Sequence, residues 1–126
     1  TANTTYAADA ISCAEEISEE LEKWCLRREA QHKLAPEAGI GIAVGDVIFG
    51  AVGNESRMEF TLIGEAVNLA AKLEKHTRKE KADIITTRKM LDVARRQGYA
   101  PKAEPKIIPQ VMLRGMPDLL DLVVLR

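Results

Sequence analysis

The chain has 126 residues, enough for one domain with a modest core, and 46% of them are apolar and 29% charged. Only 4% are aromatic, so we expect an aliphatic core. Eighteen basic and nineteen acidic residues give a formal net charge of −1, which excludes a general electrostatic attraction to nucleic acid or to an anionic membrane surface.

The first predicted element is an amphipathic helix from Ala7 to about Arg28, assigned to residues 1–29. Apolar residues recur at three- and four-residue spacing along it: Ala10, Ala14, Ile17, Leu21 and Trp24. Cys13 and Cys25 lie too far apart on this helix for a disulfide and fit no zinc spacing. Two reduced thiols favour a cytoplasmic domain. No stretch is apolar enough to span a bilayer, so a membrane anchor, if one exists, would lie outside this chain.

A β-hairpin is predicted next, over residues 39–53. Branched residues alternate with glycine and alanine from Gly39 to Val44, which gives one branched face and one nearly bare face. The pair Gly45-Asp46 fits a two-residue type II′ turn, after which Val47 to Val52 would return as the second strand. The bare face would let another backbone, or a ligand, approach closely.

The remaining elements alternate between strands and helices. We predict an extended segment at 58–63, a helix at 64–76, and a region of strands and helix over 82–126. Within that last region the strands are expected at 82–86, 110–114 and 120–125 and the helix at 87–97. This order predicts a single α+β domain, a sandwich with its helices on one face of the sheet.

The predicted helix at 64–76 has the most informative pattern. Its apolar stripe, expected to face the sheet, consists of Ala66, Leu69, Ala70 and Leu73. Asn68 and Lys72 are four residues apart and therefore project side by side from a different face. An amide next to an ammonium could hold a ribose oxygen and a phosphate. Spacing alone also allows a solvated helix face without function.

Three neighbouring stretches set this helix in a longer pattern. They are residues 39–47 (GIGIAVGDV), 50–53 (GAVG) and 57–74 (RMEFTLIGEAVNLAAKLE). Together they resemble the signature of class III nucleotidyl cyclase catalytic domains, where a glycine-flanked hairpin and an extended segment precede a helix with Asn-x-Ala-Ala-Arg. Residues 111–115 (VMLRG) are similar to the family's hydrophobic-x-Leu-Lys-Gly strand. The resemblance implies a ferredoxin-like sandwich, N-terminally truncated, with the first strands and helix missing.

The resemblance also implies a reaction, adenylate cyclase activity at a homodimer interface. ATP would bind between two domains packed through their catalytic faces and be converted to 3′,5′-cyclic AMP and pyrophosphate with two Mg²⁺ or Mn²⁺ ions. By position in the family's motifs, the catalytic residues would be Asn68, which orients the ribose, and Lys72, which stabilises phosphate charge. The substrate-binding residues would be Thr61 at the adenine edge, Leu62, Val67, and Arg114 at the outer phosphates.

Two departures from the family pattern qualify this hypothesis. Lys72 stands where the family has arginine, and an ammonium lacks the planar fork of a guanidinium. The family's metal-binding aspartates would lie upstream of Thr1, so no metal ligand is assigned here and the chain alone is expected to be inactive and to self-associate. The alternatives are a degenerate cyclase-homology module that dimerises or binds nucleotide to regulate a partner, and a guanylate cyclase, against which Thr61 argues.

Overall fold

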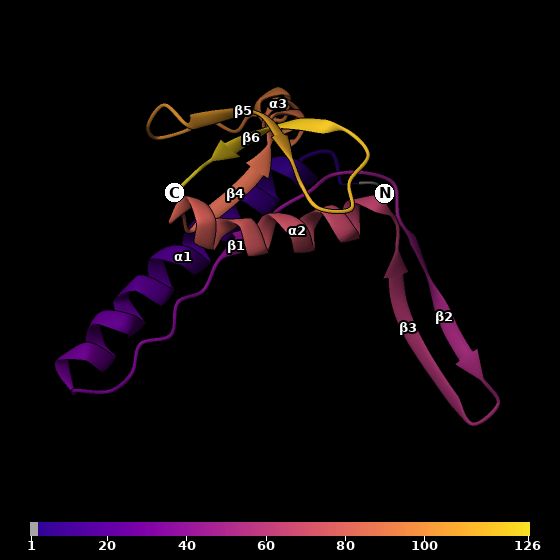
Figure 1. Cartoon of the computed structure of the whole chain (residues 1–126), viewed down its shortest axis with the longest axis horizontal. Coiled ribbons are helices and arrows are strands. Elements are labelled where there is room, and N and C mark those ends of the chain that lie inside the picture. Colours follow the sequence, from indigo (N-terminus) through magenta and orange to yellow (C-terminus); the bar gives the residue numbers. More distant parts are fainter. Residues whose placement is uncertain (1–2) are drawn as a thin grey trace.

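The computed structural model describes residues 3–126 as three helices and six strands (Figure 1). In chain order they are α1 (Tyr6–Ala30), β1 (Ile40–Gly41), β2 (Ile48–Asn54), β3 (Arg57–Ile63), α2 (Glu65–Glu80), β4 (Ile84–Thr87), α3 (Arg88–Arg96), β5 (Lys106–Met112) and β6 (Leu119–Val124). The predicted α+β class is confirmed. No helix in this range is long and apolar enough to cross a membrane.

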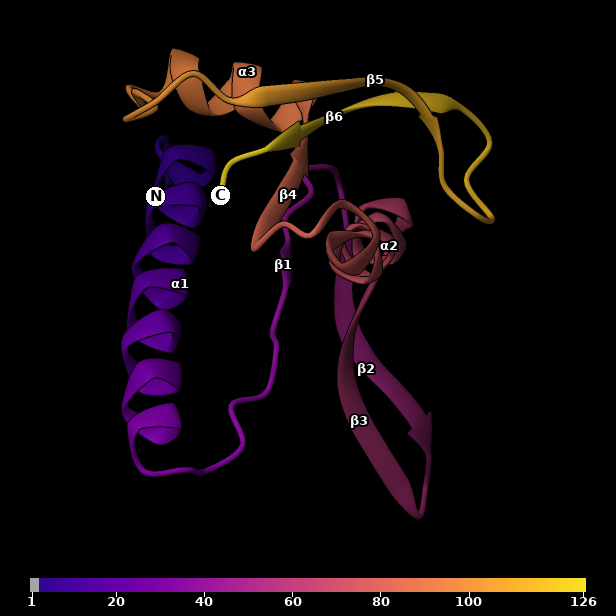
Figure 2. The same ribbon diagram turned by 60° about the vertical axis from the view of Figure 1, so that its left-hand side comes forward.

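The main sheet has the strand order β1-β4-β6-β5 and separates the helices into two layers. β1 runs parallel to β4, and the other pairings are antiparallel. Helices α1 and α3 lie on one side of β1 and β4 and α2 lies on the other (Figure 2). The prediction that all helices share one face is therefore wrong. Alternation along the strand explains the result, because Ile42 and Val44 pack toward α1 and α3 while Ala43 packs toward α2.

Each helix layer has its own core cluster. The buried residues of the cluster between α1 and α3 are Ala7, Ile11, Met90 and Ala94. Those under α2 are Leu73, Ile85, Leu113 and Leu122. Both clusters are aliphatic, as the composition predicts, and the sheet between them belongs to both.

The predicted hairpin over residues 39–53 is wrong in its pairing. The hairpin joins β2 to β3 instead, in register from Ile48 opposite Ile63 to Asn54 opposite Arg57. The turn forms at this end because the Asn54 side chain accepts hydrogen bonds from the backbone N–H groups of Ser56 and Arg57, at 3.0 and 3.1 Å. Gly45-Asp46 belongs to an irregular link between β1 and β2.

The glycine and alanine residues on one face of the strand around β1 are explained by the close approach of the α2 backbone. A Cβ at Gly41 would collide with the carbonyl oxygen of Ala70, and one at Gly39 would collide with the Thr77 side chain. The expectation that glycine admits another backbone here is confirmed, and the backbone belongs to the helix that carries Asn68 and Lys72. The glycines thus decide how close this helix lies to the sheet.

The strand predicted at 110–114 begins earlier in the structure. β5 begins at Lys106 rather than Gln110, because a bulge between Ile108 and Val111 accommodates Pro109 in an edge strand. Gln110 in that bulge has φ 50 and donates its backbone N–H to the Asp121 carboxylate at 3.0 Å. Proline in the sequence predicts a loop, but an edge strand tolerates it.

Candidate active site

Helix α2 begins directly after the hairpin, at Glu65, with Gly64 as its N-cap. The backbone N–H groups of Val67 and Asn68 donate to the Gly64 carbonyl oxygen at 3.1 and 3.4 Å. Glu65 in the first turn and basic residues in the last turn suit the helix dipole. Leu73 is fully buried beneath the helix, as the apolar stripe predicts. Asn68 lies on an exposed part of the helix surface.

Lys72 reaches across to the loop between β5 and β6. Its Nζ and Cε atoms lie 3.9 Å from the position that a Cβ on Gly115 would occupy. Gly115 has φ 84, in the left-handed region that favours glycine, and Met116 closes the turn by donating its N–H to the Leu113 carbonyl at 3.0 Å. This turn carries the exposed Arg114 beside the helix. The fold therefore brings the neighbourhoods of Lys72 and Arg114 together across 42 positions of sequence.

The charges at this point are uncompensated. Neither Lys72 nor Arg114 forms an ion pair with a carboxylate of the described chain. Two free cations and the Asn68 amide can attract and orient an anionic, hydroxyl-bearing ligand. The site is open to solvent, since Asn68 and Arg114 are exposed and Lys72 is half-buried.

Thr61 and Leu62 lie on β3, near its junction with α2. Thr61 is opposite Gly50 and Leu62 is opposite Phe49 in the hairpin register. Successive strand residues point to opposite faces, so the two side chains cannot contact the same ligand. Val67 is 36% exposed in the first turn of α2. The structure thus places Thr61 and Leu62 just before α2 and Val67 in its first turn. Lys72 lies further along α2, near the turn that carries Arg114.

An exposed apolar face on the hairpin is the main feature that sequence reasoning missed. Phe49, Met58, Phe60 and Leu62 share one face and are 68, 62, 73 and 50% exposed. The rings of Phe49 and Phe60 stack with their centroids 5.9 Å apart. The alternation of apolar residues at 58, 60 and 62 was the available signal. Exposed apolar area of this kind marks an interaction surface.

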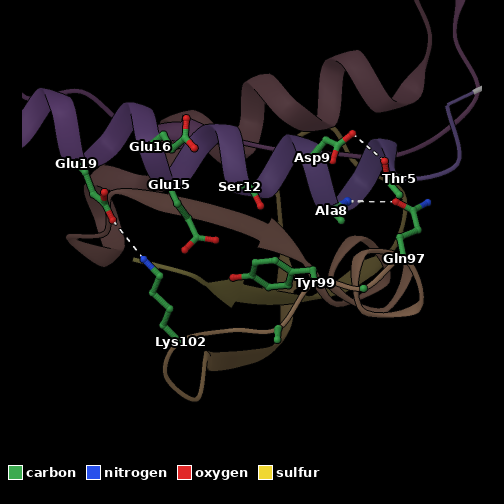
Figure 3. Close-up of a pocket in the computed structure, with 12 residues that line it drawn as sticks. Thr5, Ala8, Asp9, Ser12, Glu15, Glu16, Glu19, Gln97, Tyr99 and Lys102 are labelled. Carbon is green, nitrogen blue, oxygen red and sulfur yellow. Dashed lines mark hydrogen bonds and ion pairs between the residues drawn. The ribbon is translucent and has the colours of Figure 1, made fainter.

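A groove elsewhere on the protein has the wrong charge for a nucleotide. It lies between α1 and residues 97–102 and has a volume of about 580 Å³ (Figure 3). Its wall carries four carboxylates, those of Asp9, Glu15, Glu16 and Glu19. Burial, followed by the hydrogen bond and charge of Glu15, raises the pKa of Tyr99 in this groove to about 12. Carboxylates repel a polyphosphate, so the candidate site is the one on α2.

The described residues do not form a metal centre. Residues 3–126 contain no group of three or more His, Cys, Asp or Glu side chains that could hold a metal ion. Asp46, the acidic residue of the Gly-Asp pair, lies exposed in the link between β1 and β2. No step below is assigned to a metal.

Comparisons with known proteins agree on one family. The model of the family described as "Adenylate and Guanylate cyclase catalytic domain" matches residues 3–112. An uncharacterized protein of Mycobacterium tuberculosis, Rv1318c, is 37% identical over 79 residues, which are 63% of this chain and 14% of that protein. The terminal-differentiation specific adenylate cyclase of Dictyostelium discoideum is 45% identical over 51 residues, 40% of this chain and 2% of that protein.

Solved structures support the same fold. The adenylyl cyclase CyaB from P. aeruginosa is similar with a TM-score of 0.74 and 21% identity, covering 94% of this chain and 57% of that chain. The guanylyl cyclase Cya2 is similar with a TM-score of 0.75 and 23% identity, covering 98% and 59%. The fold is that of class III nucleotidyl cyclases. The chain belongs to the adenylate and guanylate cyclase catalytic domain family, and it spans only a small part of the curated relatives that it matches.

Proposed function

We propose that this chain forms part of an adenylate cyclase site that converts ATP to 3′,5′-cyclic AMP and pyrophosphate. The ribose 3′ oxygen forms a bond to the α-phosphorus and loses its proton. The bond from that phosphorus to the oxygen shared with the β-phosphate breaks, and pyrophosphate leaves. The observation that supports the proposal is the distance of 3.9 Å between the Lys72 Nζ and the position that a Cβ on Gly115 would occupy, because Arg114 is the neighbour of Gly115 in the same turn.

Each candidate residue has a task that follows from its chemistry. The Asn68 amide binds ribose oxygen and orients the attacking hydroxyl. Lys72, one helical turn further on, neutralises charge that develops on the α-phosphate, and Arg114 binds the outer phosphates. Thr61 contacts the adenine edge with its hydroxyl, and Val67 packs beside the nucleoside. Because Leu62 points to the other face of β3, it reaches the same ligand through its main chain only.

The metal ions of the proposed reaction are Mg²⁺ or Mn²⁺. When bound, they would activate the nucleophile and neutralise phosphate charge. The described chain offers no cluster for them, so the proposal requires carboxylates from outside residues 3–126. We therefore expect purified residues 1–126 to bind nucleotide without turning it over.

A homodimer through the catalytic face is part of the proposal. The hairpin extends away from the main sheet next to α2 (Figures 1 and 2). Its Phe49–Phe60 face is fully apolar and exposed, and burying such area against a second copy is favourable. A partner packed there would also enclose Asn68 and Lys72, which a single copy leaves open to water.

Nucleotide titration tests the substrate assignment without requiring turnover. We expect ATP to shift the backbone amide NMR signals of Asn68, Lys72 and Gly115, and Lys72→Ala to weaken ATP binding by about fivefold to tenfold. Lys79→Ala is the matched control, because Lys79 is exposed in the last turn of the same helix. Equal affinity of the Lys72→Ala variant and the wild type would refute the site. Tighter binding of GTP than ATP would favour the guanylate alternative.

The lysine at position 72 favours a second candidate, a nucleotide-binding module without catalysis. Lysine offers a point charge where a guanidinium would hold two phosphate oxygens at once. In an active assembly that contains this chain, Lys72→Arg should raise turnover and leave the apparent ATP affinity nearly unchanged. If assemblies with intact metal ligands bind ATP but release no cyclic AMP, the chain functions as a nucleotide-binding module without catalysis. Cyclic AMP made by residues 1–126 alone would contradict the need for outside ligands.

A further inference from the structure

The bulge in β5 decides which side chains of this strand face the core. Ile108 before the bulge and Val111 after it both pack against the core cluster under α2. The two residues are three positions apart, and strict alternation along a strand would put them on opposite faces of the sheet. The extra residue of the bulge removes this conflict, because it reverses the alternation for the rest of the strand.

The reversed alternation also places Arg114 at the surface. Leu113 is 4% exposed within the core cluster, and Arg114 after it is exposed in the turn that reaches Lys72 on α2 (Figure 1). Without the extra residue, the alternation that starts at Ile108 would direct the side chain at position 114 to the core side and the one at position 113 outward. The bulge is therefore a condition for a cation at this point of the candidate site.

One carboxylate of β6 holds the bulge. In the register of the two strands, Pro109 and Gln110 together stand opposite Asp121. Gln110 has φ 50, in the left-handed region that a residue with a side chain seldom adopts. Its backbone N–H donates to Oδ1 of Asp121 at 3.0 Å. The second carboxylate oxygen, Oδ2, has a separate partner, since Nη1 of Arg88 lies 3.8 Å from it. The hydrogen bond to Oδ1 therefore stabilises the conformation that the bulge requires.

We propose that Asp121 is a positioning residue for the candidate site: it holds Gln110 in the left-handed conformation and so directs Arg114 outward, to the outer phosphates of the nucleotide. This inference rests on the proposed function, because it takes Arg114 as a phosphate ligand. Asp121 contacts no ligand itself. It acts through the backbone of residues 110–114, which joins the bulge to the turn beside Lys72.

Charge and position predict opposite results when Asp121 is replaced. Loss of a negative charge would favour an anionic ligand, whereas loss of the bulge would displace Arg114 and weaken its binding to phosphate. The Asp121 side chain is 37% exposed, so its truncation leaves no core cavity. A loss of ATP affinity in Asp121→Ala is therefore the result that only the positioning role gives.

ATP titration of the whole chain, followed by NMR, tests the proposal. We expect Arg114→Ala and Asp121→Ala each to weaken ATP binding by about fivefold. Asp121→Asn keeps an acceptor oxygen for the Gln110 N–H and should bind ATP as the wild type does. Arg88→Ala is the matched control, because it removes the ion pair of Asp121 and leaves the hydrogen bond to the bulge in place.

Two double variants separate positioning from general damage. Glycine adopts a left-handed φ without the cost of a Cβ, so Gln110→Gly should restore ATP binding in the Asp121→Ala background. Asp121→Ala should cause no further loss when Arg114→Ala is already present. The strong intraresidue NOE between amide and Hα protons that marks a left-handed residue reports on Gln110 without nucleotide, and it should weaken in Asp121→Ala and persist in Asp121→Asn.

Three outcomes would overturn the positioning role and leave Arg114 as a phosphate ligand. The first is wild-type ATP affinity of Asp121→Ala beside a clear loss in Arg114→Ala. The second is an equal loss in Asp121→Asn and Asp121→Ala, and the third is an additive loss when Asp121→Ala is combined with Arg114→Ala. Wild-type affinity of Arg114→Ala is a different failure, because it would remove Arg114 from the proposed nucleotide site and the positioning role with it.

Discussion

Replacing Gly41 with alanine tests the packing on which the candidate site depends. A Cβ at this position would overlap the Ala70 carbonyl oxygen and the Glu74 backbone nitrogen, and would lie 2.9 Å from the Leu73 Cβ. The first two atoms belong to the helix backbone, which cannot move aside as a flexible side chain can. Gly41 does not have a left-handed φ, so the expected effect is steric.

Overpacking of a core by one methyl group costs about 1–3 kcal/mol. The upper part of this range applies at Gly41, because α2 as a whole must shift away from the strand. We expect the free energy of unfolding to fall by about 3 kcal/mol and the melting temperature by about 10 °C in a chain of this size. Urea denaturation followed by circular dichroism would measure the change as a lower midpoint with an unchanged slope.

Gly50→Ala is the matched control for this substitution. Gly50 lies in β2, and a Cβ there would have no heavy atom within 4 Å. We expect the free energy of unfolding of Gly50→Ala to stay within about 1 kcal/mol of the wild-type value. It should tend to rise, because alanine loses less conformational entropy on folding than glycine. Equal midpoints for Gly41→Ala and the wild type would refute the close packing of α2 on the β1 strand.

Three further predictions concern other parts of the chain. Thr87 caps α3 by accepting the Met90 N–H at 3.1 Å, so Thr87→Ala should lower stability by about 1 kcal/mol in urea denaturation; an equal loss in Thr87→Ser would contradict the cap. The pKa of Tyr99 is raised from 10.0 to about 12, so the unfolded chain loses this proton first and stability should fall as pH rises from 10 to 12. Tyr99→Phe should remove this decrease of the unfolding free energy with pH. Parallel curves of stability against pH for the variant and the wild type would disprove the role of Tyr99. Phe60→Ser should weaken self-association in sedimentation velocity more than Val52→Ser on the opposite hairpin face, and equal effects would exclude the Phe60 face as the interface.

Local patterns predicted much of the secondary structure. The helical spacing around α1 and α2 placed both helices, and α2 extends beyond the predicted end at His76 until Lys81 adopts a left-handed φ of 52. The common face of Asn68 and Lys72 follows from their spacing of four residues, because helix geometry is fixed locally. The glycine pattern of residues 39–45 predicted a close backbone approach and left the identity of the partner open.

Strand pairing and layer order could not be read from the same patterns. Gly45-Asp46 is a good local turn signal, yet β1 pairs with β4, more than forty residues later, because the sheet buries Ile84 and Ile85 in its centre. The real hairpin turns at Asn54, whose side-chain oxygen accepts hydrogen bonds from the backbone N–H groups of Ser56 and Arg57. The pairing of β1 with β4 rests on contacts between segments that are distant in the chain, which one segment's sequence does not contain.

By itself, the sequence determined the α+β class, the family resemblance and the paired projection of Asn68 and Lys72, since each is a property of local order or of one continuous pattern. Only the tertiary structure brought Gly115 and the Arg114 loop to Lys72 and left the hairpin face of Phe49 and Phe60 uncovered. These features depend on how elements that are distant in the sequence pack against one another, and local sequence patterns do not determine that packing.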